Sequence, residues 1–187
     1  GSIGGIGKNL NEPVKQFNDN VLINTNVIMI AHECKVEKLI AFGSVCAFPA
    51  KAEILSEDIL HDGEPYPAHR SYAYSKRMVD VQIEAYRKQY DCNFMSVIPV
   101  NIFGSNDNHN LVNAHVVPSL MHKFYKAYEN KTPVEIWGNG SAIREFIYAE
   151  DLAKICLDLL KLDQMPQKLI IPGKEMTILE LVNKIDF

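Results

Sequence analysis

Tyr72 and Lys76 place a phenol and an ammonium four residues apart. Side chains with this spacing lie on one face of a helix, so both can point at one site. A phenol has a pKa of about 10, and a nearby ammonium favours the phenolate and lowers that pKa. The pair can then give a proton to a carbonyl oxygen as hydride reaches the carbonyl carbon. Tyr74 is a weaker candidate, because it lies two residues before Lys76 and faces away from it.

Taken alone, this spacing is also typical of a surface helix, but Ser44 adds a second signal. Ser44 follows Gly43 at the end of a short apolar segment that we interpret as a strand. A hydroxyl at that place can hold a carbonyl group beside the phenol, although a serine after a strand is often only a turn residue. The two signals together favour a ketone reductase.

Cys46 and His115 form a second candidate pair. Inverting a carbon next to a ketone needs a base on one face and an acid on the other. A thiol and an imidazole can both titrate near neutral pH. The alternatives are a cysteine that packs as a small apolar residue and a histidine at a helix start. Spacing alone does not bring the two side chains together.

Helices and short apolar strands alternate along the chain, which predicts an α/β fold with a parallel sheet covered on both faces. Ligands bind beyond the carboxyl ends of such strands, here Gly43-Ser44 and Pro99-Val100-Asn101. The region from residue 43 to about residue 70 and the region 101–113 are predicted loops. The predicted helices are 14–34, Ser71–Tyr90, 114–129, 150–162 and Thr177–Ile185, with Thr177 as an N-cap. The predicted strands are Lys38–Phe42, Phe94–Ile98, Val134–Trp137, Glu145–Tyr148 and Lys168–Ile171.

Composition narrows the class of protein. The chain has 187 residues, 47% of them hydrophobic, and a net charge of -4. We therefore expect one core plus at most part of a second, and no nucleic-acid or membrane partner. No apolar run approaches a membrane span, and no signal peptide is evident. The four cysteines lack a C-x-x-C pair, which predicts reduced thiols and a cytoplasmic location, and the histidines show no metal-ligand spacing.

The glycines at the N-terminus formally match a G-x-x-G-x-x-G pattern between Gly1 and Gly7. A dinucleotide-binding turn needs a strand before it and a helix start directly after it. Neither is predicted here, so we interpret the match as a coincidence within a loop.

Several stretches together resemble the extended short-chain dehydrogenase/reductases and, within them, the GDP-L-fucose synthase family. These enzymes epimerise GDP-4-keto-6-deoxy-D-mannose at C3 and C5 and then reduce C4. The resemblance covers nearly the whole chain and rests on seven stretches: 43–49 (GSVCAFP), 72–80 (YAYSKRMVD), 97–104 (VIPVNIFG), 107–108 (DN), 115–118 (HVVP), 137–138 (WG) and 144–147 (REFI).

The resemblance implies a role for each candidate. Ser44, Tyr72 and Lys76 match the reductase triad, Cys46 the epimerisation base and His115 its acid. The implied cofactor is NADP and the implied substrate a GDP-sugar. Residues implied in cofactor binding are Phe42, Gly43, Ser44, Val45, Tyr72, Lys76, Pro99, Val100, Asn101, Ile102 and His115. Residues implied in substrate binding are Lys123, Trp137 and Arg144.

Two of these substrate residues have a physical rationale. A guanidinium such as that of Arg144 binds phosphate oxygens bidentately. Lys123 stands where bacterial members of the family have arginine. An ammonium is a point charge and binds phosphate with less directional hydrogen bonds than a guanidinium does.

The resemblance also predicts a division of the chain. Residues 1–104 would be the remainder of a Rossmann-like, doubly wound NADP-binding domain. Residues 105–187 would be mainly part of a smaller sugar-binding lobe. In the family, further βα units precede the first stretch, the lobe continues beyond residue 187, and the enzymes are homodimers. Two alternatives stay open: another nucleotide-sugar reductase or epimerase, and a non-catalytic fragment or paralogue with a binding or structural role.

Overall fold

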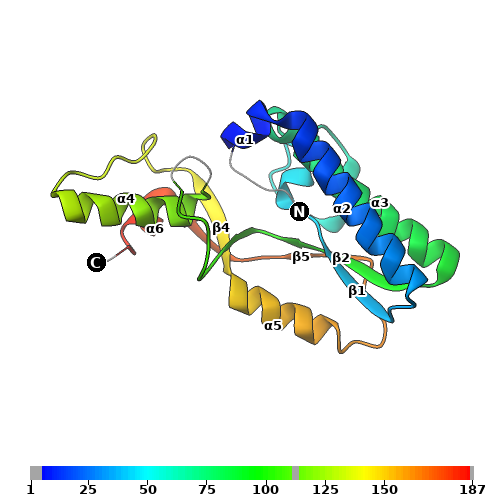
Figure 1. Ribbon diagram of the computed structural model, residues 1–187. Helices are drawn as coiled ribbons and strands as arrows, with labels where there is room; N and C mark the ends of the chain where they lie inside the picture. Colours follow the sequence, from blue (N-terminus) through cyan, green and yellow to red (C-terminus); the bar gives the residue numbers. More distant parts are fainter. Residues whose placement is uncertain (1–5, 111–113, 186–187) are drawn as a thin grey trace.

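A three-stranded parallel sheet forms one of the two sheets of the fold (Figure 1). The computed structural model describes residues 6–110 and 114–185. The sheet has the order β1-β2-β5 and consists of β1 (Lys38–Phe42), β2 (Asn93–Pro99) and β5 (Lys168–Ile171). Phe42 lies opposite Val97, and Pro99 opposite Ile171, so the strands end at the same edge. The prediction of parallel strands with these bounds is confirmed to within one residue.

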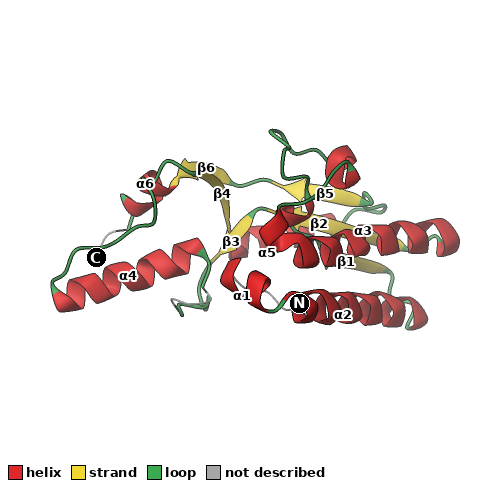
Figure 2. Cartoon of the chain, turned by 90° about the horizontal axis from the view of Figure 1, so that it is seen from above, coloured by secondary structure: helices red, strands yellow, loops and turns green. Residues whose placement is uncertain are grey.

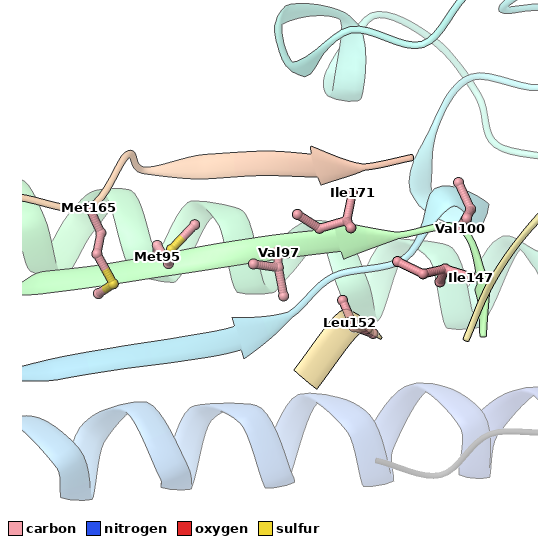
Figure 3. Close-up of a cluster of buried hydrophobic side chains, with 7 residues drawn as sticks. All are labelled: Met95, Val97, Val100, Ile147, Leu152, Met165 and Ile171. Carbon is pink, nitrogen blue, oxygen red and sulfur yellow. The ribbon is translucent and has the colours of Figure 1, made fainter. Parts of the chain in front are cut away.

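Helices cover both faces of this sheet, as predicted. The helices α2 (Pro13–Glu33) and α3 (Arg70–Tyr90) pack on one face, where Ile28, Val79, Ile83 and Phe94 are buried together. The helix α5 (Ala149–Leu159) packs on the other face. Figure 3 shows the buried cluster on that side, made of Met95, Val97, Val100, Ile147, Leu152, Met165 and Ile171. Because both faces of β2 are covered, residues on both faces are buried and its sequence is mainly apolar without alternation.

The helix α2 confirms the prediction for 14–34, but its orientation is unusual. It buries two amide side chains, Gln16 and Asn20, together with Ile28 and Ala31. Several apolar side chains point outward instead: Val14 (71% exposed), Leu22 (60%), Val27 (52%) and Ile30 (51%). The side that α2 buries is therefore partly polar, and much of its apolar surface faces outward.

A second sheet continues directly from the first (Figure 2). It has the order β3-β4-β6, with β3 (Asn101–Phe103) parallel and β6 (Lys174–Thr177) antiparallel to β4 (Ile143–Tyr148). The helices α4 (Val116–Asn130) and α6 (Ile178–Val182) contribute to the cluster around Phe146. The predicted N-cap at Thr177 is confirmed, since Thr177 and Glu180 form a capping box.

The secondary structure differs from the prediction in several places. Residues 134–137 do not form a strand, and Ile136 packs against the cluster around Phe146 instead. The predicted loop 101–113 begins with β3, and β6 was not expected. A short helix, α1 (Ile6–Asn11), was not expected either. Residues 1–5, which hold most of the glycine match, lie outside the described residues.

The segment between β1 and α3 contains three 3-10 helices, η1 (Val45–Ala47), η2 (Glu57–His61) and η3 (Pro67–His69). The buried Asp80 of α3 anchors it, because His61 Nε2 lies 2.9 Å and Lys168 Nζ 3.0 Å from the same carboxylate oxygen. Glu57 Oε1 also accepts the Ile170 amide of β5 at 2.9 Å. These bonds hold the segment against the edge of the sheet.

Candidate active site

The turn after β1 positions Ser44. The Gly43 amide donates to Val97 O at 2.7 Å, which keeps the chain beside β2 beyond the strand. A Cβ at Gly43 would lie 3.0 Å from Ile98 Cγ1, so glycine permits this close approach. Ser44 then has extended backbone angles and caps η1, where its hydroxyl accepts the Cys46 amide at 3.3 Å. One short turn therefore presents both the hydroxyl and the thiol.

The helix α3 brings Tyr72 and Lys76 to the same place. Both side chains are buried, and Lys76 Nζ lies 5.8 Å from the centre of the Tyr72 ring. Lys76 Nζ donates to Phe42 O at 2.9 Å, which ties it to the end of β1. Tyr74 points elsewhere, as predicted, because its hydroxyl donates to Glu64 at 2.9 Å.

The electrostatics of the phenol differ from the expectation. Burial raises the pKa of Tyr72 to about 12, outweighing a hydrogen bond with Ser44 that lowers it, and Cys46 raises it further. Burial lowers the pKa of Lys76. The expected lowering of the phenol pKa by Lys76 is therefore wrong, because desolvation dominates. At neutral pH the phenol is protonated, and this is the form that can donate a proton.

The thiol of Cys46 joins the same cluster. Burial raises its pKa, while hydrogen bonds with the Ser44 side chain and its own amide lower it. Ser44 thus interacts with both the Tyr72 phenol and the Cys46 thiol. His115 is the N-cap residue of α4, and its carbonyl accepts the Ser119 amide at 3.0 Å. Within residues 6–110 and 114–185, no hydrogen bond or ion pair joins His115 to this cluster.

A cavity of about 180 Å³ lies at the carboxyl ends of the strands. Arg144 of β4 lines this cavity together with Val45 and Asn101. The fold thus brings together three predicted site residues from segments that are far apart in the sequence. The Asn101 amide donates to Glu145 O at 2.8 Å, which fixes β3 against β4 there. Sequence reasoning missed Leu55, Ile143 and the two glutamates, since no spacing signal marks them. The lining residues are Val45, Leu55, Val100, Asn101, Ile143, Arg144, Glu145 and Glu175.

Lys123 and Trp137 contact each other but form a separate group. Lys123 Nζ lies 5.1 Å from the Trp137 ring centre and donates to Glu135 O at 3.1 Å. Trp137 is 89% exposed. In the part of the chain that the structure describes, neither residue contacts Arg144 through a hydrogen bond or ring contact.

The residues present fit a dinucleotide. An ammonium carries three donors, and among the described residues Lys76 Nζ has a single acceptor, Phe42 O. Two donors therefore remain for hydroxyl groups of a ligand beside the strand end. The described residues contain no group of three or more histidine, cysteine or acidic side chains that could hold a metal ion. None of the described helices has the length and apolar composition that a membrane span requires.

Comparisons with known proteins place these features in a family. The NAD dependent epimerase/dehydratase family model matches residues 1–171. The chain is 43% identical over 153 residues to the GDP-L-fucose synthase of Dictyostelium discoideum. The aligned region covers 81% of this chain and 48% of that relative. It is 34% identical over 194 residues to a probable GDP-L-fucose synthase of Drosophila melanogaster, which covers 98% of the chain and 60% of the relative.

A solved structure gives the same result for the fold. A GDP-L-fucose synthetase from Naegleria fowleri bound to NADP matches with a TM-score of 0.89 and 36% identity, over 97% of this chain and 61% of that one. The chain thus spans about half to three-fifths of the length of these relatives. The Rossmann-like, partly parallel α/β fold is confirmed, and the chain belongs to the NAD-dependent epimerase/dehydratase family, with GDP-L-fucose synthases among its relatives.

Proposed function

We propose that this chain carries the proton-transfer site of an NADPH-dependent enzyme that converts GDP-4-keto-6-deoxy-D-mannose to GDP-L-fucose. The observation that carries the proposal is the meeting of Ser44, Cys46, Tyr72 and Lys76 at the end of β1. The similarity to GDP-L-fucose synthases supports the choice of substrate.

In the reduction, Tyr72 donates its phenolic proton to the C4 oxygen of the sugar. Ser44 holds that oxygen beside the phenol, and Lys76 stabilises the phenolate that forms. Bound NADPH would supply the hydride that the carbonyl carbon needs. Lys76, the turn at 42–45 and the segment 99–102 would hold the cofactor, with His115 as a further contact.

In the epimerisation, Cys46 removes a proton from the carbon next to the ketone and His115 returns one to the opposite face. A thiolate with a raised pKa is a strong base once it has formed, which suits a weakly acidic C–H bond. Burial of Cys46 supports this role. The assignment of His115 rests on the family resemblance.

For the substrate, we propose that Arg144 binds the diphosphate of the GDP-sugar, with Lys123 and Trp137 as further contacts. The cavity supports the first assignment, because Arg144 lines it together with Val45 and Asn101 beside the strand ends. A guanidinium is suited to phosphate oxygens.

A second copy of the chain is the proposed partner. The outward apolar side chains of α2, with Met78 (40% exposed) and Val81 (46%) of α3, would then be covered by the same surface of the partner. The proposed compartment is the cytoplasm, which all four cysteines support because they are free.

Titration of the chain with NADPH, followed by nicotinamide fluorescence, tests the cofactor site. Saturable binding is expected, and an assay with the keto-sugar in deuterated water follows. Tyr72→Phe should stop reduction while deuterium uptake at C3 and C5 continues, and Cys46→Ser should stop that uptake. Equal loss of both reactions in Tyr72→Phe would contradict separate roles, and uptake at the full rate in Cys46→Ser would sink the base assignment.

The outcomes also separate the alternatives. Turnover of a different keto-sugar, and not of this one, would favour another nucleotide-sugar enzyme. No binding of NADPH would favour a part of a longer enzyme, or a non-catalytic chain, over an active unit.

A further inference from the structure

A thiol–imidazole pair lies at the opposite end of β2 from the candidate active site. Cys92 immediately precedes β2, and its Sγ lies 3.4 Å from Nδ1 of His32 in the last turn of α2. Two tyrosines of α3 hold the imidazole in place. The ring stacks on Tyr90 at 4.2 Å between centres and meets Tyr86 edge-on at 5.3 Å. The nitrogen that faces Cys92 is therefore fixed by packing and not by the thiol alone.

Cys92 also lines a cavity of about 350 Å³, larger than the cavity at the strand ends. This volume lies within the range of small-molecule sites. Both cations in its wall belong to the end of α3, and Arg87 is held there because Nη1 donates to Phe94 O at 2.8 Å. These two cations are Arg87 and Lys88, and the remaining residues that line the cavity beside Cys92 are polar or acidic: Glu84, Asp91, Gln164 and Gln167.

We propose that Cys92 is a thiol-modification site, at which the chain forms a mixed disulfide with a small acidic thiol. The co-reactant is the symmetric disulfide of that thiol, a peptide-like molecule with carboxylates that Arg87 and Lys88 can attract. His32 Nδ1 takes the proton of the Cys92 thiol as its sulfur attacks one sulfur of the reagent. The bond between the two reagent sulfurs breaks, a new bond to Cys92 Sγ forms, and the departing thiolate takes the proton from His32. Cys92 is oxidised and half of the reagent is reduced, so electrons balance.

The imidazole is needed because the thiol does not ionise readily. Burial and the nearby Asp91 carboxylate raise the pKa of Cys92, which leaves little thiolate near neutral pH. Burial likewise raises the pKa of Cys156, but among the described residues no imidazole contacts that thiol. Cys156 is therefore an internal comparison for Cys92 in the same molecule.

The test is to incubate the chain with glutathione disulfide at pH 7.5, stop the reaction with acid, and measure each modified cysteine by peptide mass spectrometry over time. We expect Cys92 to react at least about tenfold faster than Cys156. His32→Gln should slow Cys92 at least about tenfold, since positioned acid–base groups contribute 10²–10⁴-fold in active sites. Cys34 and Cys156 should keep their rates. Equal Cys92 rates with and without His32, or a Cys92 no faster than Cys156, would overturn the proposal.

A second variant keeps the test independent of any effect of His32 on folding. Lys88→Gln changes one exposed charge in the cavity wall. It should slow the reaction of Cys92 with glutathione disulfide about threefold, the size of one exposed charge pair. The uncharged 2-hydroxyethyl disulfide should react equally with both proteins. If the ratio of the Cys92 rates with the two reagents is the same in Lys88→Gln and in the unchanged chain, recognition of an acidic thiol is refuted.

Discussion

Replacing Asp80 by asparagine tests the buried charge that ties the segment before α3 to β5. The Asp80 side chain is 3% exposed, and its carboxylate meets His61 at 2.9 Å, Lys168 at 3.0 Å and Gln167 at 3.4 Å. Asparagine keeps the volume, so the change opens no cavity, but it leaves Lys168, which is only 21% exposed, without its carboxylate. A hydrogen bond to a charged group contributes roughly 1.5–3 kcal/mol. Because His61 is 40% exposed and can regain water, we expect a total loss of about 2–3 kcal/mol.

Urea unfolding followed by circular dichroism measures this loss directly. For a chain of this length, 1 kcal/mol shifts the melting temperature by roughly 2–4 °C, so Asp80→Asn should lower it by roughly 4–12 °C. The matched control is Asp158→Asn, because that carboxylate pairs with Lys161 at 2.7 Å while 72% exposed. The control should stay within about 0.5 kcal/mol of the unchanged chain. The same small effect in Asp80→Asn would refute the reasoning.

Three further substitutions have expected outcomes. With a folded pKa of about 12 and an unfolded pKa of about 10, Tyr72 keeps its proton longer in the folded state, so raising the pH from 9 to 11 should remove about 1.3 kcal/mol of stability. Tyr72→Phe should lack this loss in paired urea titrations. Gln16→Met should leave the melting temperature unchanged or raise it. The reason is that neither polar atom of the fully buried Gln16 side chain has a hydrogen-bond partner among the described residues. A fall of several degrees in the melting temperature would contradict this expectation. Gly173→Ala should cost at least about 2 kcal/mol in the same assay, since its Cβ would clash with the Phe146 carbonyl oxygen, and a neutral result would show that the backbone adjusts there.

The first sheet was predictable because its signals are local. The apolar run 39–42 lies between Lys38 and Gly43, and the strand Lys38–Phe42 follows those bounds. The second sheet was not predictable in the same way. β3 has three residues and pairs with β4, which lies more than forty residues later. Residues 134–137 have a strand-like composition but pair with no strand in the part of the chain that the structure describes, and Ile136 packs in the cluster around Phe146 instead. Pairing partners, and not local preference, decide these cases.

The candidate site was likewise predictable only where its signals are local in the sequence. The spacing of Tyr72 and Lys76 on one helix was enough to place them together, and Ser44 follows the strand that they pack against. The pKa of Tyr72 could not be read from its neighbour, because the extent of burial sets its direction. The contact between Ser44 and Cys46 depends on a 3-10 turn that no spacing rule specifies. The place of Arg144 at the cavity depends on the pairing of β3 with β4.

The outward apolar side chains of α2 have a consequence for how stability is measured. In the proposed dimer, the second copy that covers Leu22, Val27 and Ile30 binds the folded chain and not the unfolded one. Mass action then adds a term that grows with the logarithm of the partner's concentration, about 1.4 kcal/mol for each tenfold increase above the dissociation constant. If that dimer forms, the melting temperature of this chain depends on the protein concentration as well as on the sequence. It has a defined meaning only at a stated protein concentration.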